Sequence, residues 1–102
     1  MPTYMPVAKI ADIPAGRVKV VEAAGQRIAV CHLDDRWYAI EDRCSHDDGP
    51  LGEGTLTGVH LECPRHGARF DVTTGRPITL PAVVPVRQFP VKIEGDTVLV
   101  QV

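Results

Sequence analysis

Two short stretches of the chain each place one cysteine close to one histidine. The first is Cys44-Ser-His46, with one residue between the two side chains, and the second is Cys63-Pro-Arg-His66, with two. Sixteen residues separate His46 from Cys63. Thiolate and imidazole ligands together favour metal ions of borderline softness. Two of each therefore predict a metal site assembled from two separate loops.

Three kinds of site would use these residues. A structural zinc ion takes four Cys and His ligands, but its ligand pairs usually have two to four residues between them, and the first pair here has one. A cysteine nucleophile with a histidine base would leave one cysteine and one histidine unexplained. An iron–sulfur cluster in which two histidines replace two cysteines on one iron would use all four residues.

The four residues and their neighbours resemble the Rieske iron–sulfur signature, whose two loops read Cys-x-His and Cys-x-x-His. The resemblance extends to Gly49-Pro50-Leu51 after the first loop and to Gly67 after the last histidine. It continues through Phe70-Asp71 and Thr74-Gly75, and it covers the region from about residue 37 to residue 81. This length of agreement favours the iron–sulfur interpretation over the other two.

The resemblance implies one [2Fe–2S] cluster with a defined set of ligands. In the family, two cysteines bind the inner iron and two histidines bind the outer iron. Carried over to this sequence, Cys44 and Cys63 hold the inner iron, and His46 and His66 hold the outer one. Because neutral imidazoles replace two thiolates, such a cluster accepts an electron more readily than an all-cysteine cluster.

The residues around the ligands place this sequence within the family. High-potential relatives carry an additional cysteine in each loop, joined as a disulfide, whereas residues 47–50 and Arg65 provide none here. Those relatives also have a serine and a tyrosine that bond to sulfur, where this chain has Ala68 and Phe70. Fewer hydrogen bonds to sulfur stabilise the reduced cluster less. The resemblance thus implies a potential near the bottom of the Rieske range of about −150 to +300 mV.

Short strands are expected to position the two loops. Alternating, β-branched runs predict strands over Arg17–Glu22, Gln26–Leu33, Trp37–Glu41, Val91–Glu94 and Thr97–Val102. Turns are predicted at Ala24-Gly25, Asp34–Arg36 and Gly95-Asp96. Between the two loops, Thr55–Thr57 and Val59–Glu62 flank Gly58 and predict a tight hairpin that would bring the loops side by side.

The expected fold class is all-β, because no segment longer than about ten residues shows a helical period. The resemblance makes it a Rieske-like antiparallel β-sandwich with a small cluster-binding subdomain, about 43–69, made of two loops at its tip. Residues 1–102 are expected to form one domain. Trp37 and Tyr38 alternate on a predicted strand, so one is expected in the core and the other more exposed.

Composition excludes several classes of function. Apolar residues make up 44% of the chain and charged residues 24%, with a net charge of −2 and no run of lysine or arginine, which argues against nucleic-acid binding. No apolar stretch is long enough to span a membrane and no signal peptide is evident, so a cytoplasmic location is expected.

The residues outside the paired loops are expected to have structural roles. Three cysteines without a secretion signal do not indicate a disulfide framework. Cys31 is expected to be a small core residue. His32 and His60 lie on predicted strands and are expected to be partly exposed residues rather than ligands.

The sequence contains no mononuclear iron motif and no flavin or nucleotide fingerprint. We therefore expect an electron carrier with no catalytic residues rather than an enzyme. The resemblance implies a soluble Rieske ferredoxin, monomeric, serving aromatic hydrocarbon catabolism. It would take electrons from a flavin-containing, NAD(P)H-dependent ferredoxin reductase and pass them to a terminal, ring-hydroxylating oxygenase. A small subunit of a larger reductase, such as nitrite reductase, and a zinc-binding structural module are the alternatives.

Overall fold

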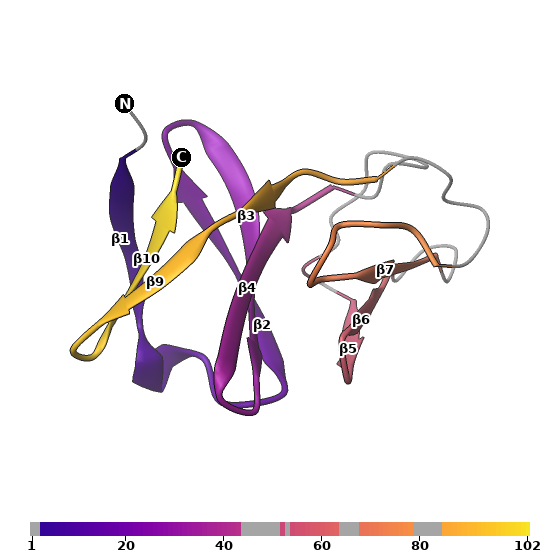
Figure 1. The fold of residues 1–102 in the computed structure, drawn as a ribbon, viewed down its shortest axis with the longest axis horizontal. Helices are drawn as coiled ribbons and strands as arrows, with labels where there is room; N and C mark the ends of the chain where they lie inside the picture. Colours follow the sequence, from indigo (N-terminus) through magenta and orange to yellow (C-terminus); the bar gives the residue numbers. More distant parts are fainter. Residues whose placement is uncertain (1–2, 44–51, 53, 64–67, 79–84) are drawn as a thin grey trace.

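The computed structural model describes residues 3–43, 52, 54–63, 68–78 and 85–102. Within these ranges the chain is almost entirely antiparallel β-structure, with one single-turn 3-10 helix, η1 (Ile10–Asp12). Three sheets follow one another along the longest axis of the molecule (Figure 1). No helix in the described ranges is long and apolar enough to cross a membrane. The predicted all-β antiparallel fold is confirmed.

The first sheet brings the two ends of the described chain together. β1 (Tyr4–Lys9) pairs with β10 (Thr97–Gln101), which pairs in turn with β9 (Val91–Glu94). The predicted hairpin at Gly95-Asp96 is present, although β10 ends one residue before the predicted boundary. β1 was not predicted as a strand, because Pro6 interrupts its pattern. The proline is tolerated there since β1 lies at an edge of the sheet.

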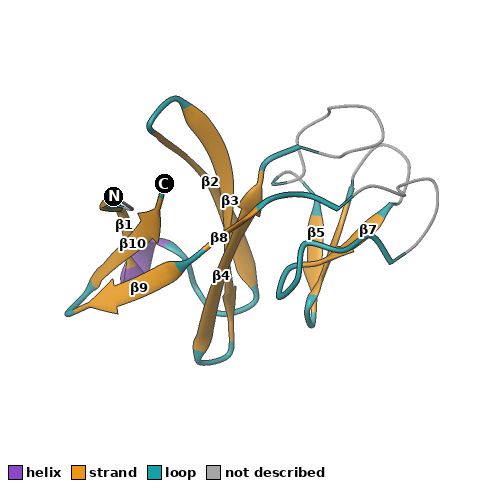
Figure 2. Ribbon diagram, turned by 45° about the horizontal axis from the view of Figure 1, so that its top comes forward, coloured by secondary structure: helices purple, strands orange, loops and turns teal. Residues whose placement is uncertain are grey.

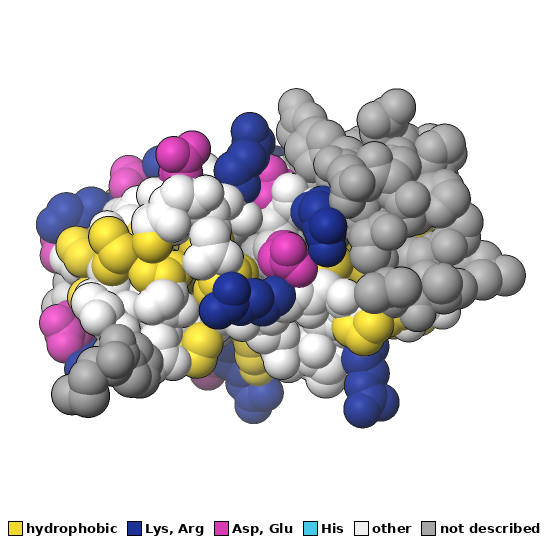
Figure 3. All heavy atoms as spheres, turned by 90° about the horizontal axis from the view of Figure 1, so that it is seen from above, with side chains coloured by type: hydrophobic (Ala, Val, Ile, Leu, Met, Phe, Trp, Pro, Cys, Tyr) yellow, Lys and Arg dark blue, Asp and Glu magenta, His cyan; other side chains and the backbone are white. Residues whose placement is uncertain are grey.

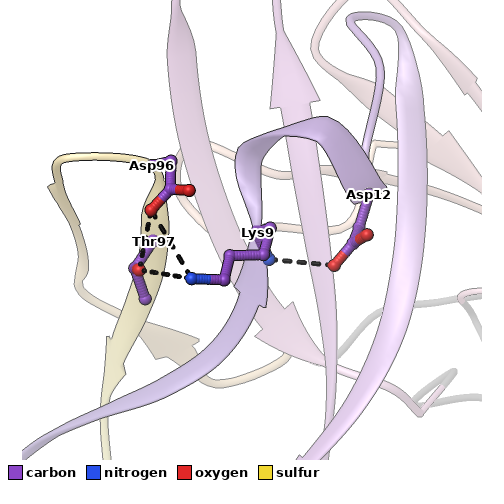
Figure 4. A network of polar contacts seen from close by, with 4 residues as sticks. All are labelled: Lys9, Asp12, Asp96 and Thr97. Atoms are coloured by element: carbon purple, nitrogen blue, oxygen red, sulfur yellow. Dashed lines mark hydrogen bonds and ion pairs between the residues drawn. The ribbon is translucent and has the colours of Figure 1, made fainter.

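A small polar network holds the end of β1 against the β9–β10 turn (Figure 4). The Lys9 ammonium lies 3.5 Å from Asp96 Oδ1 and 3.5 Å from Thr97 Oγ1. The backbone N–H of Lys9 donates to Asp12 Oδ2 at 2.9 Å. The Lys9 and Asp96 side chains are 60% and 80% exposed, so their ion pair adds little stability.

The central sheet is an antiparallel meander with a short fourth strand at its edge. Its strands, in spatial order, are β2 (Arg17–Ala23), β3 (Gln26–Leu33), β4 (Arg36–Glu41) and β8 (Gln88–Phe89). The predicted turn at Ala24-Gly25 connects β2 and β3, and the turn predicted at Asp34–Arg36 connects β3 and β4 but contains only Asp34 and Asp35, because Arg36 pairs with Leu33 as the first residue of β4. β8 pairs with β4 through only two residues, which is too short a run for a sequence pattern to reveal.

Both faces of the central sheet are buried, which explains the uninterrupted apolar run in β3. Ile28 to Cys31 are all inaccessible to solvent. Ile28 and Val30 pack toward the first sheet, while Ala29 and Cys31 pack toward the third. Trp37 and Tyr38 divide in the same way between the two cores and are both half-buried. The expectation that one of these aromatic residues would lie in the core and the other be more exposed was wrong, because each packs partly buried against a different core.

The third sheet contains β5 (Thr55–Thr57), β6 (His60–Glu62) and β7 (Arg69–Asp71). The predicted β5–β6 hairpin is present, but β6 begins at His60 because Val59 belongs to the turn. β7 was not predicted; it pairs with β6, so these two paired strands flank the second ligand stretch, Cys63-Pro-Arg-His66, in the sequence. Figure 2 shows this sheet at the opposite end of the molecule from β1, β9 and β10.

Candidate metal centre

Cys63 lies directly after β6, in the core between the central and third sheets. It is 1% exposed and is not in a disulfide. Its backbone N–H donates to the Ala68 carbonyl at 2.6 Å, which closes the second ligand stretch at its base. Leu61 and Phe70, both fully buried, belong to the same core. The structure thus places a buried sulfur donor where the sequence predicts an inner-iron ligand.

The other three predicted ligands, Cys44, His46 and His66, lie outside the described residues. Among the residues that are described, no group of three or more Cys, His, Asp or Glu side chains is arranged to hold a metal ion. The four-residue ligand set therefore stays a prediction. The described part of the site fits a cluster, since Cys63 offers a buried thiol in an apolar setting at the base of its loop.

A buried carboxylate joins the two described ends of the first ligand stretch. Asp42 follows β4, and its side chain is fully buried. The backbone N–H of Gly52, beyond the ligand stretch, donates to Asp42 Oδ1 at 2.6 Å. Arg27 donates to the other oxygen, with Nε and Nη2 at 3.1 and 3.0 Å from Asp42 Oδ2. Asp42 belongs to none of the predicted ligand motifs.

Gly52 is required by the space around it. A Cβ atom added to Gly52 would run into Val20 Cγ2 and would lie 3.0 Å from Asp42 Oδ1. Gly52, which follows the first ligand stretch, therefore lies against β2 as well as against the end of β4. Any larger residue at position 52 would push the backbone away from Val20 and Asp42.

Phe70 and Asp71 are the last two residues of β7, and Asp71 begins a tight turn that leads through Thr74 to Gly75. Asp71 Oδ1 accepts hydrogen bonds from the backbone and the hydroxyl of Thr73, at 2.8 and 2.5 Å. The N–H of Gly75 donates to the Asp71 carbonyl at 2.7 Å. Gly75 has a φ of +78°, and a Cβ there would meet the Val86 carbonyl oxygen. This part of the signature is explained by backbone geometry.

The remaining cysteine and histidines have the structural roles expected of them. Cys31 is fully buried on β3, and burial raises the pKa of its thiol to about 12. The ring of His32 stacks on Trp37, with centroids 3.9 Å apart, and its Nδ1 lies 2.7 Å from the Ile13 carbonyl oxygen, to which it donates. His60 is half-buried on β6. Cys31 is confirmed as a core residue, and His32 and His60 are confirmed as partly exposed strand residues.

Charges near the end of β4 pair with one another. Glu41 Oε1 accepts the backbone N–H of Arg87 at 2.8 Å, and Glu41 Oε2 lies 3.6 Å from Arg43 Nε. On the face of the molecule seen in Figure 3, basic and acidic side chains are interspersed over the described part of the surface. This described face offers no uniform charge that would steer a strongly charged partner.

Comparison with known proteins identifies the family. The model of the Rieske [2Fe–2S] domain family matches residues 3–90. This chain belongs to the Rieske family. The ferredoxin component of biphenyl 2,3-dioxygenase from Rhodococcus jostii is 44% identical to this Rieske chain over 89 residues, covering 87% of the chain and 83% of that protein. The predicted cofactor, one [2Fe–2S] cluster, is confirmed.

Solved structures agree with this assignment. The ferredoxin of carbazole 1,9a-dioxygenase from Nocardioides aromaticivorans superposes on the Rieske chain with a TM-score of 0.93 at 36% identity, covering 96% of each chain. A chain from the complex of reduced oxygenase and oxidized ferredoxin in carbazole 1,9a-dioxygenase superposes with a TM-score of 0.91 at 37% identity, covering 96% and 92%. The three-sheet arrangement is therefore that of Rieske ferredoxins.

Proposed function

We propose that this Rieske protein is the ferredoxin component of a ring-hydroxylating dioxygenase system. It carries single electrons to a terminal oxygenase and does not itself transform a substrate. The observation that carries the proposal is the agreement over 96% of both chains with the ferredoxin of carbazole 1,9a-dioxygenase. A further matched chain comes from a complex of oxygenase and ferredoxin, which supports the oxygenase as the electron acceptor.

The proposed ligands are Cys44 and Cys63 for the inner iron and His46 and His66 for the outer iron. When bound, the [2Fe–2S] cluster supplies one-electron redox chemistry. The described residues support this assignment through Cys63, whose sulfur is shielded from water in the core that contains Phe70. A dry, apolar setting restricts solvent access to the ligand and tunes the potential of the centre.

The proposed electron donor is a flavin-containing, NAD(P)H-dependent ferredoxin reductase. Nicotinamides donate two electrons as hydride, whereas a [2Fe–2S] cluster takes one, so a flavin is needed between them. The side chains of Ala68 and Phe70 are fully buried and carry no hydroxyl group, which supports a potential at the low end of the range. The proposal includes a monomeric, single-domain carrier working in the cytoplasm in aromatic hydrocarbon catabolism, with its cluster-binding part at about 43–69.

The proposal is tested on the purified, anaerobically handled protein. We expect two iron atoms and two sulfide ions per chain, and an EPR signal on dithionite reduction typical of a cluster with histidine ligands. We also expect reduction by NAD(P)H only when a flavoprotein reductase is added, followed by reoxidation by a ring-hydroxylating oxygenase. Cys63→Ser should abolish both steps, while the matched variant Cys31→Ser should retain them. A colourless protein that contains zinc and no sulfide would refute the proposal.

A further inference from the structure

Asp42 is the one fully buried carboxylate within the described ranges. A buried charge is costly unless it is paired and hydrogen-bonded, so the contacts of this side chain indicate what it does. Its two oxygens contact two different parts of the chain. Oδ1 accepts the Gly52 N–H at 2.6 Å, and Oδ2 accepts from the guanidinium of Arg27 at 3.0 and 3.1 Å.

The backbone at Asp42 is fixed as well. Its N–H donates to the Arg27 carbonyl at 3.0 Å, which continues the β3–β4 ladder beyond the end of β4. Asp42 and Arg27 therefore contact one another through both backbone and side chain. The carboxylate is held on the rigid central sheet, and from there it holds Gly52, ten residues further along the chain.

We propose that Asp42 is a positioning residue for the metal centre. Its carboxylate ties Gly52, beyond the first ligand stretch, to the end of β4, before that stretch, and so fixes the chain on both sides of the proposed ligands Cys44 and His46. This inference rests on the proposed function, since it assumes that these residues bind the cluster. Groups that orient metal ligands without touching the metal commonly change metal affinity by about 10- to 100-fold when they are removed.

The packing of Gly52 against Val20 supports the same inference. A Cβ at Gly52 would overlap Val20 Cγ2 and crowd Asp42 Oδ1. Gly52→Ala should therefore displace the return of the ligand stretch while leaving the carboxylate chemically intact. Val20→Ala removes the atom that the new Cβ would strike, so the double variant should recover part of the original arrangement.

The experiment compares loaded, full-length proteins by the rate at which a chelator removes iron and by the EPR spectrum of the reduced cluster. We expect Asp42→Ala to release iron about 10-fold faster than the wild type, or more, and to shift or broaden the EPR signal. Asp42→Asn, which keeps an acceptor for the Gly52 N–H, should release iron at an intermediate rate. Gly52→Ala should behave like Asp42→Ala, and Val20→Ala in that background should slow the release again.

Two controls separate positioning from general stability. Asp12→Asn alters a carboxylate that also accepts a backbone N–H, that of Lys9 at the end of β1, but belongs to η1, beside the first sheet (Figures 2 and 4). Val98→Ala weakens the other core, where Val98 is fully buried. We expect both variants to release iron at close to the wild-type rate in denaturant-free buffer and to keep the wild-type EPR spectrum.

Wild-type iron release and an unchanged spectrum in both Asp42→Ala and Gly52→Ala would overturn the inference. So would equally fast release from Val98→Ala, because Asp42 would then act only through global stability. If Asp42→Ala does not fold, the Gly52→Ala variant and its rescue by Val20→Ala decide the question. A wild-type protein without an iron–sulfur cluster would refute the proposed function and this inference together, whereas a loaded wild type with unaffected variants would refute this inference alone.

Discussion

Cys31 provides a quantitative test of how the core between the central and third sheets is packed. The thiol is fully buried on β3, and burial raises its pKa from 9.0 to about 12. Below pH 9 the thiol is protonated in the folded and the unfolded chain, so its contribution to stability is fully present. Between pH 9 and 12 the unfolded chain releases the proton while the folded chain retains it. The folded state then binds more protons, and stability falls as the pH rises.

The size of the effect follows from the same numbers. Above the pKa of the unfolded thiol, each further pH unit lowers the free energy of unfolding by about 1.4 kcal/mol, as long as the folded thiol stays protonated. The wild type should therefore lose about 1.4 kcal/mol more stability than Cys31→Ala when the pH is raised from 8 to 10. The assay is anaerobic urea denaturation of both proteins at both pH values, with equal incubation times. Tyrosine and lysine titration and loss of the cluster are common to the two proteins and cancel in the difference.

The Cys31→Ala variant also tests the ligand assignment, since it should keep a full complement of iron and sulfide. Equal pH dependence in the two proteins would refute the reasoning, because it would mean that the thiolate of Cys31 is tolerated in the core between the central and third sheets. Loss of the cluster from Cys31→Ala would contradict the separation of this cysteine from the proposed ligands.

Three further variants test other parts of the site. Cys63→Ala should abolish cluster binding, measured as iron and sulfide per chain, and an intact cluster would contradict the role of this cysteine. Ala68→Ser combined with Phe70→Tyr should raise the midpoint potential, because the new hydroxyl groups can donate hydrogen bonds to the reduced cluster. Each hydrogen bond that stabilises the reduced cluster by ~1 kcal/mol should raise the potential by about 40 mV. A lower potential measured by voltammetry would contradict this. Gly75→Ala should lower the free energy of unfolding by at least ~1 kcal/mol, because φ at this position is +78° and the added Cβ would meet the Val86 carbonyl oxygen. An unchanged free energy of unfolding would refute this explanation of the turn.

Local patterns predicted the elements that have clear turn residues. The Asp34-Asp35 turn sets the register of β3 and β4, and Gly95-Asp96 sets that of β9 and β10. The strands that were missed, β1, β7 and β8, are short or contain proline, and each forms by pairing with a neighbour rather than through its own pattern. Such pairing is a property of the assembled sheets and leaves little trace in the strand itself.

The four ligands were predicted from their residue types and spacing, but the contacts around them could be predicted only in part. The register set by Asp34-Asp35 places Arg27 opposite Asp42, so this ion pair could have been found by counting back from the turn. The sequence gives no sign that Gly52 lies against Val20, because this contact joins segments about thirty residues apart. The positions of Cys44, His46 and His66 lie outside the described residues and stay predictions.

The pairing of β1 with β10 has a practical consequence for attaching this protein to other molecules. The Val102 N–H donates to the Thr3 carbonyl at 3.1 Å, so the first and last described residues are neighbours (Figure 1). They lie next to the ends of β1 and β10, in the part of the molecule opposite the third sheet, which Cys63 directly follows at the end of β6. A surface anchor or a fused protein joined at either terminus would therefore leave the end with Cys63 directed outward. The fold suits immobilisation on an electrode or fusion to a second redox protein from either end of the chain.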